Sequence, residues 1–114
     1  MVFNPIRRPI GMLRQHILSI TPIGMHIEDV ISKLENEISH DSFRVNLNRG
    51  FTTRITMFEE DTVWVGEMSI RAYLGSYMAW YKWFPLMDWG VIAFFGFDEN
   101  GQLIDIYVEK IGMS

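Results

Sequence analysis

The residue types most often used for metal binding and acid–base chemistry are few in this 114-residue chain and lie far apart. No two of its three histidines, His16, His26 and His40, have the i, i+4 spacing that places two metal ligands on one helix face. The sequence contains no cysteine, which removes thiolate metal sites, disulfides and thiol catalysis together. We therefore expect no metal site, and we interpret the histidines as a helix residue, a capping residue and a loop residue.

An acidic pattern near the end of the chain matches a calcium-binding loop only in part. Glu109 follows Asp98 at the separation of the first and last ligands of such a loop, but no glycine occupies the sixth position. Residues 103–108 are apolar and β-prone, which is unsuited to wrapping around an ion. We interpret Asp98-Glu99-Asn100-Gly101 as the turn of a β-hairpin, because Asn-Gly accepts the positive backbone angles of such turns.

Carboxylates also stand together at Glu59, Glu60 and Asp61. Adjacent acids on a turn are hydrated and repel one another, so they are not individually tuned for proton transfer. The sequence has no Gly-x-Ser-x-Gly elbow, no phosphate-binding glycine loop and no dinucleotide-binding glycine pattern. It therefore predicts a protein that has no catalytic residues and no cofactor.

Two helices are predicted in the N-terminal part of the chain. The first begins at Pro9, and its apolar residues recur with helical spacing up to the break at Thr21-Pro22-Ile23-Gly24. The second begins near His26 and carries Glu28 and Asp29 in its first turn, where the helix dipole favours negative charge. Its apolar positions share one face: Ile27, Val30, Ile31, Leu34 and Ile38.

After His40 the apolar period changes from helical to alternating, which is typical of strands. We predict a hairpin of residues 43–47 and 51–57, a strand over 62–68 that is extended or restarted over 69–77, and a last hairpin of 91–97 and 103–108. Two helices and about five antiparallel strands predict an α+β fold with the helices packed on one sheet face. At this length we expect a single domain over residues 1–114.

Two short segments resemble the two ends of one known small domain. One is a glycine-led turn into a helix with a valine and a leucine, and the other is a strand ending in Phe-Asp, a glycine turn and a last strand. The matching residues are Gly24, Met25, Val30, Leu34, Phe97, Asp98, Gly101, Leu103 and Val108. In these segments the chain resembles the β-lactamase-inhibitor-protein-like fold, which small outer-membrane assembly lipoproteins share. The resemblance implies one module of that fold and a role in non-catalytic protein binding.

The chain departs from those proteins because it has no lipid-attachment cysteine, no disulfide cysteines and no recognisable export signal. Its N-terminal apolar residues are interrupted by Pro5, Pro9 and Arg14, so we expect a cytoplasmic protein. The most apolar stretch, residues 83–97, is too short for a membrane span. The net charge is −4 and the ten basic residues are scattered, which argues against a nucleic-acid partner.

Aromatic residues are concentrated between Tyr73 and Phe97, where ten of the sixteen aromatic side chains occur. We interpret Phe94, Phe95 and Phe97 as ordinary sheet residues. Residues 80–89, in contrast, have neither alternating nor helical spacing, and a small two-layer domain has limited room to bury so many rings. We consider four roles for this segment: a lid on the core, a partner surface, a homodimer contact or the lining of a ligand pocket. The candidate binding residues are Tyr77, Trp80, Tyr81, Trp83, Phe84 and Trp89.

These observations predict a non-catalytic module that binds another protein, as an inhibitor or an immunity-type protein, through the aromatic surface. Binding to a second copy of the chain is a variant of this prediction. The alternative is a carrier or sensor with an aromatic-lined pocket for an apolar or cationic small molecule.

Overall fold

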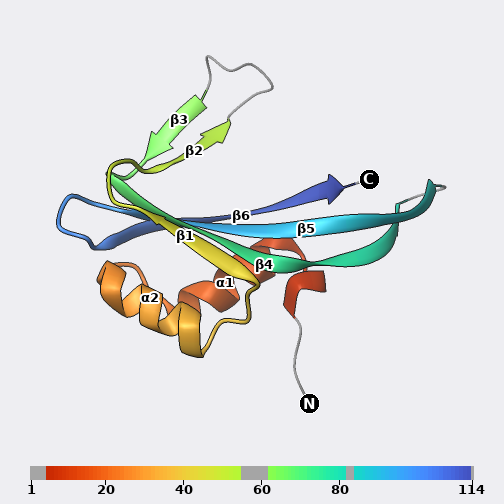
Figure 1. Ribbon diagram of the computed structural model, residues 1–114, viewed down its shortest axis with the longest axis horizontal. Helices are drawn as coiled ribbons and strands as arrows, with labels where there is room; N and C mark the ends of the chain where they lie inside the picture. The colour runs from red at the N-terminus through yellow and green to blue at the C-terminus, as the bar shows by residue number, and fades with distance from the viewer. Residues whose placement is uncertain (1–4, 55–61, 82–83, 114) are drawn as a thin grey trace.

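A computed structural model describes residues 5–54, 62–81 and 84–113 of the chain (Figure 1). The helices come first in the chain: a short 3-10 helix over Pro5–Arg7, α1 over Ile10–Ile20 and α2 over Ile27–Asn36. The strands follow: β1 over Ser42–Asn46, β2 over Phe51–Arg54, β3 over Thr62–Val65, β4 over Met68–Tyr81, β5 over Phe84–Phe97 and β6 over Leu103–Met113.

The strands form one antiparallel sheet of four strands, in the order β1-β4-β5-β6, and a separate antiparallel pair, β2-β3. The helices lie on one side of the four-stranded sheet and the β2-β3 pair lies on the other (Figure 1). The predicted α+β fold, with two N-terminal helices on one face of an antiparallel sheet, is confirmed. The main sheet has four strands where the sequence predicted about five.

The core lies between the helices and the sheet. Leu13 and Ile17 of α1, and Val30 and Leu34 of α2, are buried there, as the helical spacing predicted. The sheet supplies mostly alternate residues of its three long strands, because successive strand side chains point to opposite faces, and a register shift between β5 and β6 interrupts the alternation after Leu103. These residues are Ile70, Ala72, Leu74, Val91, Ala93, Phe95, Phe97, Leu103, Ile106 and Val108.

Both helices are short, with 11 residues in α1 and 10 in α2. Within the described ranges, no helix combines the length and the apolar composition needed to cross a membrane. His26 caps α2, because its Nδ1 accepts a hydrogen bond of 3.2 Å from the backbone N–H of Glu28. The interpretation of His26 as a capping residue is therefore confirmed.

The two segments that carry the family resemblance meet in space. The backbone N–H of Gly24 donates to the carbonyl of Leu103 at 2.7 Å, and the N–H of Leu103 donates to the carbonyl of Met25 at 2.8 Å. The N–H of Ile27 donates to the carbonyl of Gly101 at 2.7 Å. These bonds attach the start of α2 to the turn between β5 and β6.

The predicted turn at residues 98–101 is also confirmed. One carboxylate oxygen of Asp98, Oδ1, accepts hydrogen bonds of 2.9 Å from the backbone N–H groups of Asn100 and Gln102. Gly101 has a φ of 80°, the left-handed conformation that glycine adopts without a steric penalty. Asp98 therefore holds a hairpin turn, as its side chain is commonly found to do.

The predicted hairpin of residues 43–47 and 51–57 is wrong in its pairing. β1 pairs with β4, with Phe43 opposite Ala72, whereas β2 pairs with β3. The pairing with β4 places β1 in the main sheet, where Phe43 packs against the core. After β1 the chain passes to the other side of the sheet, and Gly50 approaches the carbonyl oxygens of Val65 and Gly66 so closely that a β-carbon would overlap them.

Candidate functional site

The face of the sheet opposite the helices, which we call the outer face, carries the side chains that alternate with the core residues. On β1 and β4 these include Arg44, Arg71 and Tyr73, and on β5 and β6 they include Phe94 and Tyr107. Register places them in rows across the strands, with Arg71 opposite Phe94 and Phe94 opposite Tyr107. Basic and aromatic side chains therefore share this face.

One end of the outer face is covered by the β2-β3 pair. Phe51 at the start of β2 is only 5% exposed, because its ring packs on those of Phe94 and Tyr107 at centroid distances of 5.7 and 6.5 Å. Gly96 lies beneath this ring, and a β-carbon there would stand 2.9 Å from a Phe51 ring atom. The glycine thus lets the hairpin pack closely on the sheet.

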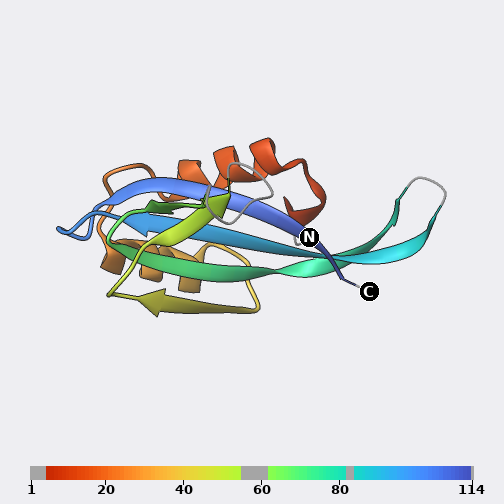
Figure 2. The same cartoon turned by 90° about the horizontal axis from the view of Figure 1, so that it is seen from above.

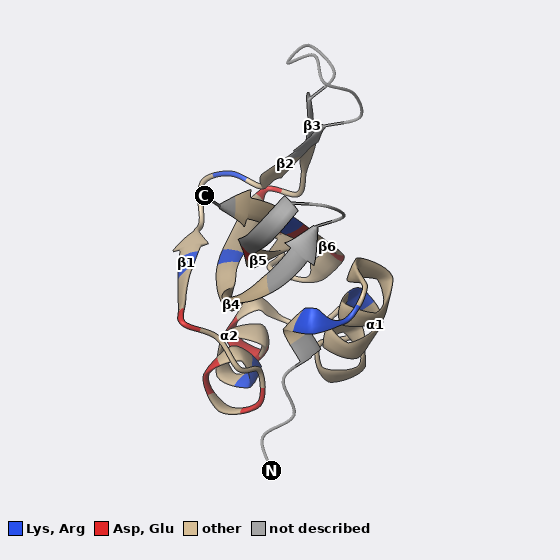
Figure 3. Cartoon of the chain, turned by 90° about the vertical axis from the view of Figure 1, so that its right-hand side faces the viewer, with Lys and Arg blue, Asp and Glu red and all other residues tan. Residues whose placement is uncertain are grey.

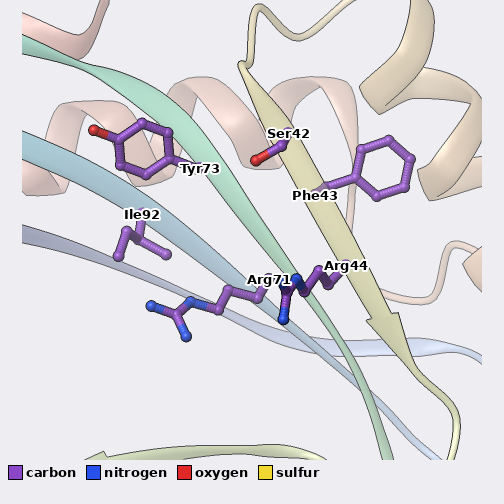
Figure 4. Close-up of a pocket in the computed structure, with 6 residues that line it drawn as sticks. All are labelled: Ser42, Phe43, Arg44, Arg71, Tyr73 and Ile92. Atoms are coloured by element: carbon purple, nitrogen blue, oxygen red, sulfur yellow. The ribbon is translucent and has the colours of Figure 1, made fainter.

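Beyond the hairpin, the outer face contains a cavity of about 310 Å³, the arginine cavity. Ile92, only 6% exposed, lies among its lining residues, and Tyr73 is half-buried. In Figure 4 the side chains of Ser42, Arg71, Tyr73 and Ile92 extend to one side of the sheet and the Phe43 ring to the other. The lining residues are Ser42, Phe43, Arg44, Arg71, Tyr73 and Ile92.

Arg44 and Arg71 are direct cross-strand partners in the β1-β4 register, and both are exposed. Like charges in this position repel one another. The Arg71 guanidinium lies 5.8 Å from the centre of the Phe94 ring, in a cation–π contact. Among the described residues, no carboxylate forms an ion pair with either arginine.

A second cavity, of about 290 Å³, adjoins the first and also contains Arg44 and Arg71 in its lining. It extends to the loop after β1, where the Arg49 guanidinium lies 5.7 Å from the centre of the Trp64 ring. Trp64 itself is 56% exposed. Three guanidinium groups therefore line two adjoining hollows on one face of an acidic protein.

The charge of the molecule is unevenly distributed (Figure 3). Acidic residues gather on α2, which contains Glu28, Asp29 and Glu35 on its exposed positions. Basic residues lie on β1, on β4 and in the loop after β1, and also in the N-terminal segment before α1 and on α2. The net charge of −4 therefore does not describe the outer face, where the positive charge is local.

Two of the predicted binding residues, Tyr77 and Trp89, are opposite each other on β4 and β5, and both are half-buried. Tyr77 packs against the helix-side core, where the Lys110 ammonium donates a hydrogen bond of 3.0 Å to its hydroxyl. The Arg7 guanidinium lies 5.1 Å from the same ring. Tyr77 is therefore already engaged by two cations of its own chain.

Three other predicted binding residues, Trp80, Tyr81 and Phe84, lie in an arm of the sheet. There β4 and β5 continue beyond the helices (Figure 2), and Tyr81 pairs with Phe84. Trp80 also belongs to this arm as part of β4, but the side chains of these three residues are outside the described part of the structure. Trp83 lies outside the described residues altogether. The role of the arm as a contact surface remains a prediction.

The histidines do not meet. His16 is on α1, His26 caps α2, and the His40 ring nitrogen Nδ1 lies 2.8 Å from the carbonyl oxygen of Ile38. Over the described ranges, no three His, Cys, Asp or Glu residues are grouped so that they could hold a metal ion. The distribution of the histidines over a helix, a cap and a loop is as predicted.

Sequence reasoning missed the arginine cavity. Arg44 and Arg71 are separated by 26 residues and belong to no recognisable motif. The available signal was local: each arginine stands between two apolar residues in a strand, in Phe43-Arg44-Val45 and in Ile70-Arg71-Ala72. Such alternation indicates the face on which a residue lies, but the pairing of β1 with β4 is needed to bring the two together.

We compared the chain with models of protein families, with curated proteins and with solved structures, and none of the three comparisons finds a match. The resemblance to the β-lactamase-inhibitor-protein-like fold therefore remains a prediction.

Proposed function

We propose that the protein is a non-catalytic module that binds another protein through the outer face of its sheet. The observation that carries this proposal is the composition of that face. Tyr107 and Arg44 are exposed there in spite of a well-packed core on the other side of the same sheet, and Trp64 is exposed on the β2-β3 pair beside them. Tryptophan, tyrosine and arginine are the residue types that supply most of the binding energy in protein interfaces.

The shape of the face favours a protein over a small molecule. Cavities of about 310 and 290 Å³ are at the lower end of the range for ligand pockets, which enclose most of the surface of a bound molecule. Both cavities are lined by arginine, which disfavours the cationic ligand of the alternative prediction. Shallow adjoining hollows with exposed rings beside them are better suited to side chains of a partner.

A blocking role, as an inhibitor or an immunity-type protein, is the form of this function that the family resemblance favours. The arm formed by β4 and β5 belongs to the same sheet as the outer face (Figure 2). The proposal does not depend on the arm, because the described residues of the outer face already form a candidate interface.

Site-specific photocrosslinking tests this function in cells that naturally make the protein. A benzoylphenylalanine residue replaces Tyr107 on the outer face or Trp64 on the β2-β3 pair that covers part of it. The matched control positions are Glu28 and Glu35 on α2, which are also exposed. We expect a covalent adduct of one defined mass from positions 64 and 107 and none from the α2 positions. Thermal melting of each variant verifies that the fold is retained.

Two results would contradict the proposal. Adducts that form only from the α2 positions would place the interface on the acidic side of the molecule. An adduct with twice the mass of the chain from positions 64 and 107 would assign the outer face to a homodimer instead of a separate partner.

A further inference from the structure

We propose that the arginine cavity and the cavity beside it bind the carboxylate groups of an extended acidic segment of a partner protein. This inference rests on the proposed function and names the chemistry of the partner. It follows from three features of the outer face: a like-charge pair, guanidinium groups that form no ion pair with a described carboxylate, and the limited extent of the positive charge.

The first feature is the direct opposition of Arg44 and Arg71 across β1 and β4. A glutamate in either position would convert a repulsive cross-strand pair into an attractive one, so folding alone disfavours the pair. No described carboxylate forms an ion pair with either guanidinium. A binding role is expected at positions where a local rule of stability is broken, and here no described residue compensates the repulsion.

The second feature is the availability of the guanidinium donors. The Arg71 guanidinium lies 5.8 Å from the centre of the Phe94 ring, and it forms no ion pair with a carboxylate among the described residues. A carboxylate accepts two parallel hydrogen bonds from a guanidinium group. Ser42 and Tyr73 line the same cavity and add hydroxyl donors, while the buried side chain of Ile92 adds an apolar surface.

The two cavities share Arg44 and Arg71, and the second adds Arg49. They therefore form a continuous row of binding positions and not a single pocket for one isolated anion. Side chains that point to the same side of an extended chain are about 7 Å apart. An extended segment with an acidic residue at every second position would present one carboxylate to each part of this row.

The third feature, the limited extent of the positive charge, favours a short acidic segment over a long polyanion such as RNA as the ligand. On the β6 side, Glu109 stands opposite Ile92, so an acidic residue borders the arginine cavity. The rings of Phe94 and Tyr107 already pack against Phe51, which reduces the stacking surface available to bases. Nucleic-acid binding draws on many phosphate contacts, and three arginines on a chain of net charge −4 supply few.

A nitrogen-15 NMR titration of the full chain tests the inference. The probe is a six-residue peptide of alternating glutamate and alanine, and the matched peptide has glutamine in place of glutamate. We expect amide shifts in residues 42–46 and 69–73 with the glutamate peptide, and we expect them to weaken as salt is raised. Arg44→Gln and Arg71→Gln should each weaken binding about tenfold, since each removes a charge-assisted pair.

The control variant is Lys33→Gln on α2, which removes one positive charge on the side of the helices. We expect it to bind the glutamate peptide as the unsubstituted chain does. Equal binding of the glutamine peptide would overturn the inference, because the carboxylates would then contribute nothing. Tighter binding of a six-nucleotide RNA or of inorganic phosphate at the same residues would also overturn it, in favour of a phosphate site.

The crosslinking experiment distinguishes failure of this inference from failure of the proposed function. If the adduct from position 64 or 107 persists in the Arg44→Gln/Arg71→Gln double variant, the outer face binds a protein without using the arginines, and only the inference fails. If the adduct disappears while the fold is retained, both stand. If the glutamate peptide binds and no adduct forms in cells, the proposed function fails. The inference that the carboxylates belong to a partner protein then fails as well.

Discussion

The two faces of the four-stranded sheet are built from alternate residues of the same strands and differ in almost every property. On the helix side, Ile70, Ala72 and Phe95 are fully buried. On the outer face, their neighbours Arg71, Tyr73 and Phe94 are exposed or half-buried. The comparison teaches that one set of strands stabilises the fold with one face, which leaves the other face able to carry side chains that folding does not favour.

The outer face is itself divided. Near the turn between β5 and β6, the β2-β3 pair covers it through Phe51 and is fitted closely by Gly96. Toward β1 it is open and holds the like-charge pair Arg44 and Arg71. Stabilising contacts and charge repulsion thus lie side by side on this face, and substitutions can measure the contribution of each to stability.

The largest effect is expected on the helix side. Phe95→Ala should lower the free energy of unfolding by about 3–5 kcal/mol, because it leaves a cavity in a fully buried site. Urea denaturation measures this loss. Tyr107→Ala is the matched aromatic substitution on the outer face, where the ring is 39% exposed, and should cost less than half as much. Equal losses in the two variants would contradict the division between the faces.

A smaller loss of stability is expected where the β2-β3 pair joins the four-stranded sheet. Gly66 precedes β4 with a φ of 83°, and a β-carbon there would stand 2.6 Å from the carbonyl oxygen of Phe97. Gly66→Ala should therefore lower the free energy of unfolding by about 1–3 kcal/mol. Thermal or urea denaturation measures it.

The control for this substitution is Gly11→Ala in α1. A β-carbon at Gly11 meets no atom within 4 Å, so alanine should raise the stability by about 0.5–1 kcal/mol through its helix propensity. If both substitutions had the same sign, the backbone at Gly66 would not be constrained in the way that the structure indicates.

The sequence predicted the helix side better than the outer face, and the reason is physical. The stripe that includes Val30 and Leu34 reports burial directly, because a helix face is set by local periodicity. The turn at 98–101 depends on its own residues in the same way. Strand alternation indicates a face but not a partner, so the sequence assigned β1 to the wrong neighbour and could not bring Arg44 to Arg71.

The candidate site was predicted in the aromatic residues 77–89 because composition was its only signal. Tyr77 and Trp89 are half-buried, and Tyr77 already contacts Lys110 of its own chain. An aromatic ring in a sequence does not indicate whether it packs on the core or faces a partner. The arginine cavity depends on a pairing between distant strands, for which composition contains no information.

Reversing the charge of Arg44 tests the outer face through an expected gain in stability. Arg44→Glu should raise the free energy of unfolding by about 0.2–1 kcal/mol, since glutamate then stands opposite Arg71. The same variant should lose binding of the glutamate peptide. Adding Arg71→Glu should remove the gain, because the pair again has like charges. Urea denaturation at low salt measures the cycle, and a loss of stability in Arg44→Glu would show that Arg44 supports the fold.

The smallest effect is expected at Arg14, which forms an ion pair with Asp105. Arg14 of α1 forms an ion pair of 2.8 Å with Asp105, and its Nε donates to the carbonyl of Ile106 on β6, the edge strand of the sheet. Because both side chains are more than two fifths exposed, a double-mutant cycle of Arg14→Ala and Asp105→Ala should give a coupling below about 1 kcal/mol. The coupling should shrink in high salt. A larger, salt-independent coupling would mean that the hydrogen bond of 2.8 Å between Arg14 and Asp105, and not charge attraction, joins α1 to the sheet edge. The contrast with Arg44 and Arg71, which form no ion pair with a described carboxylate, would then rest on hydrogen bonding instead of charge.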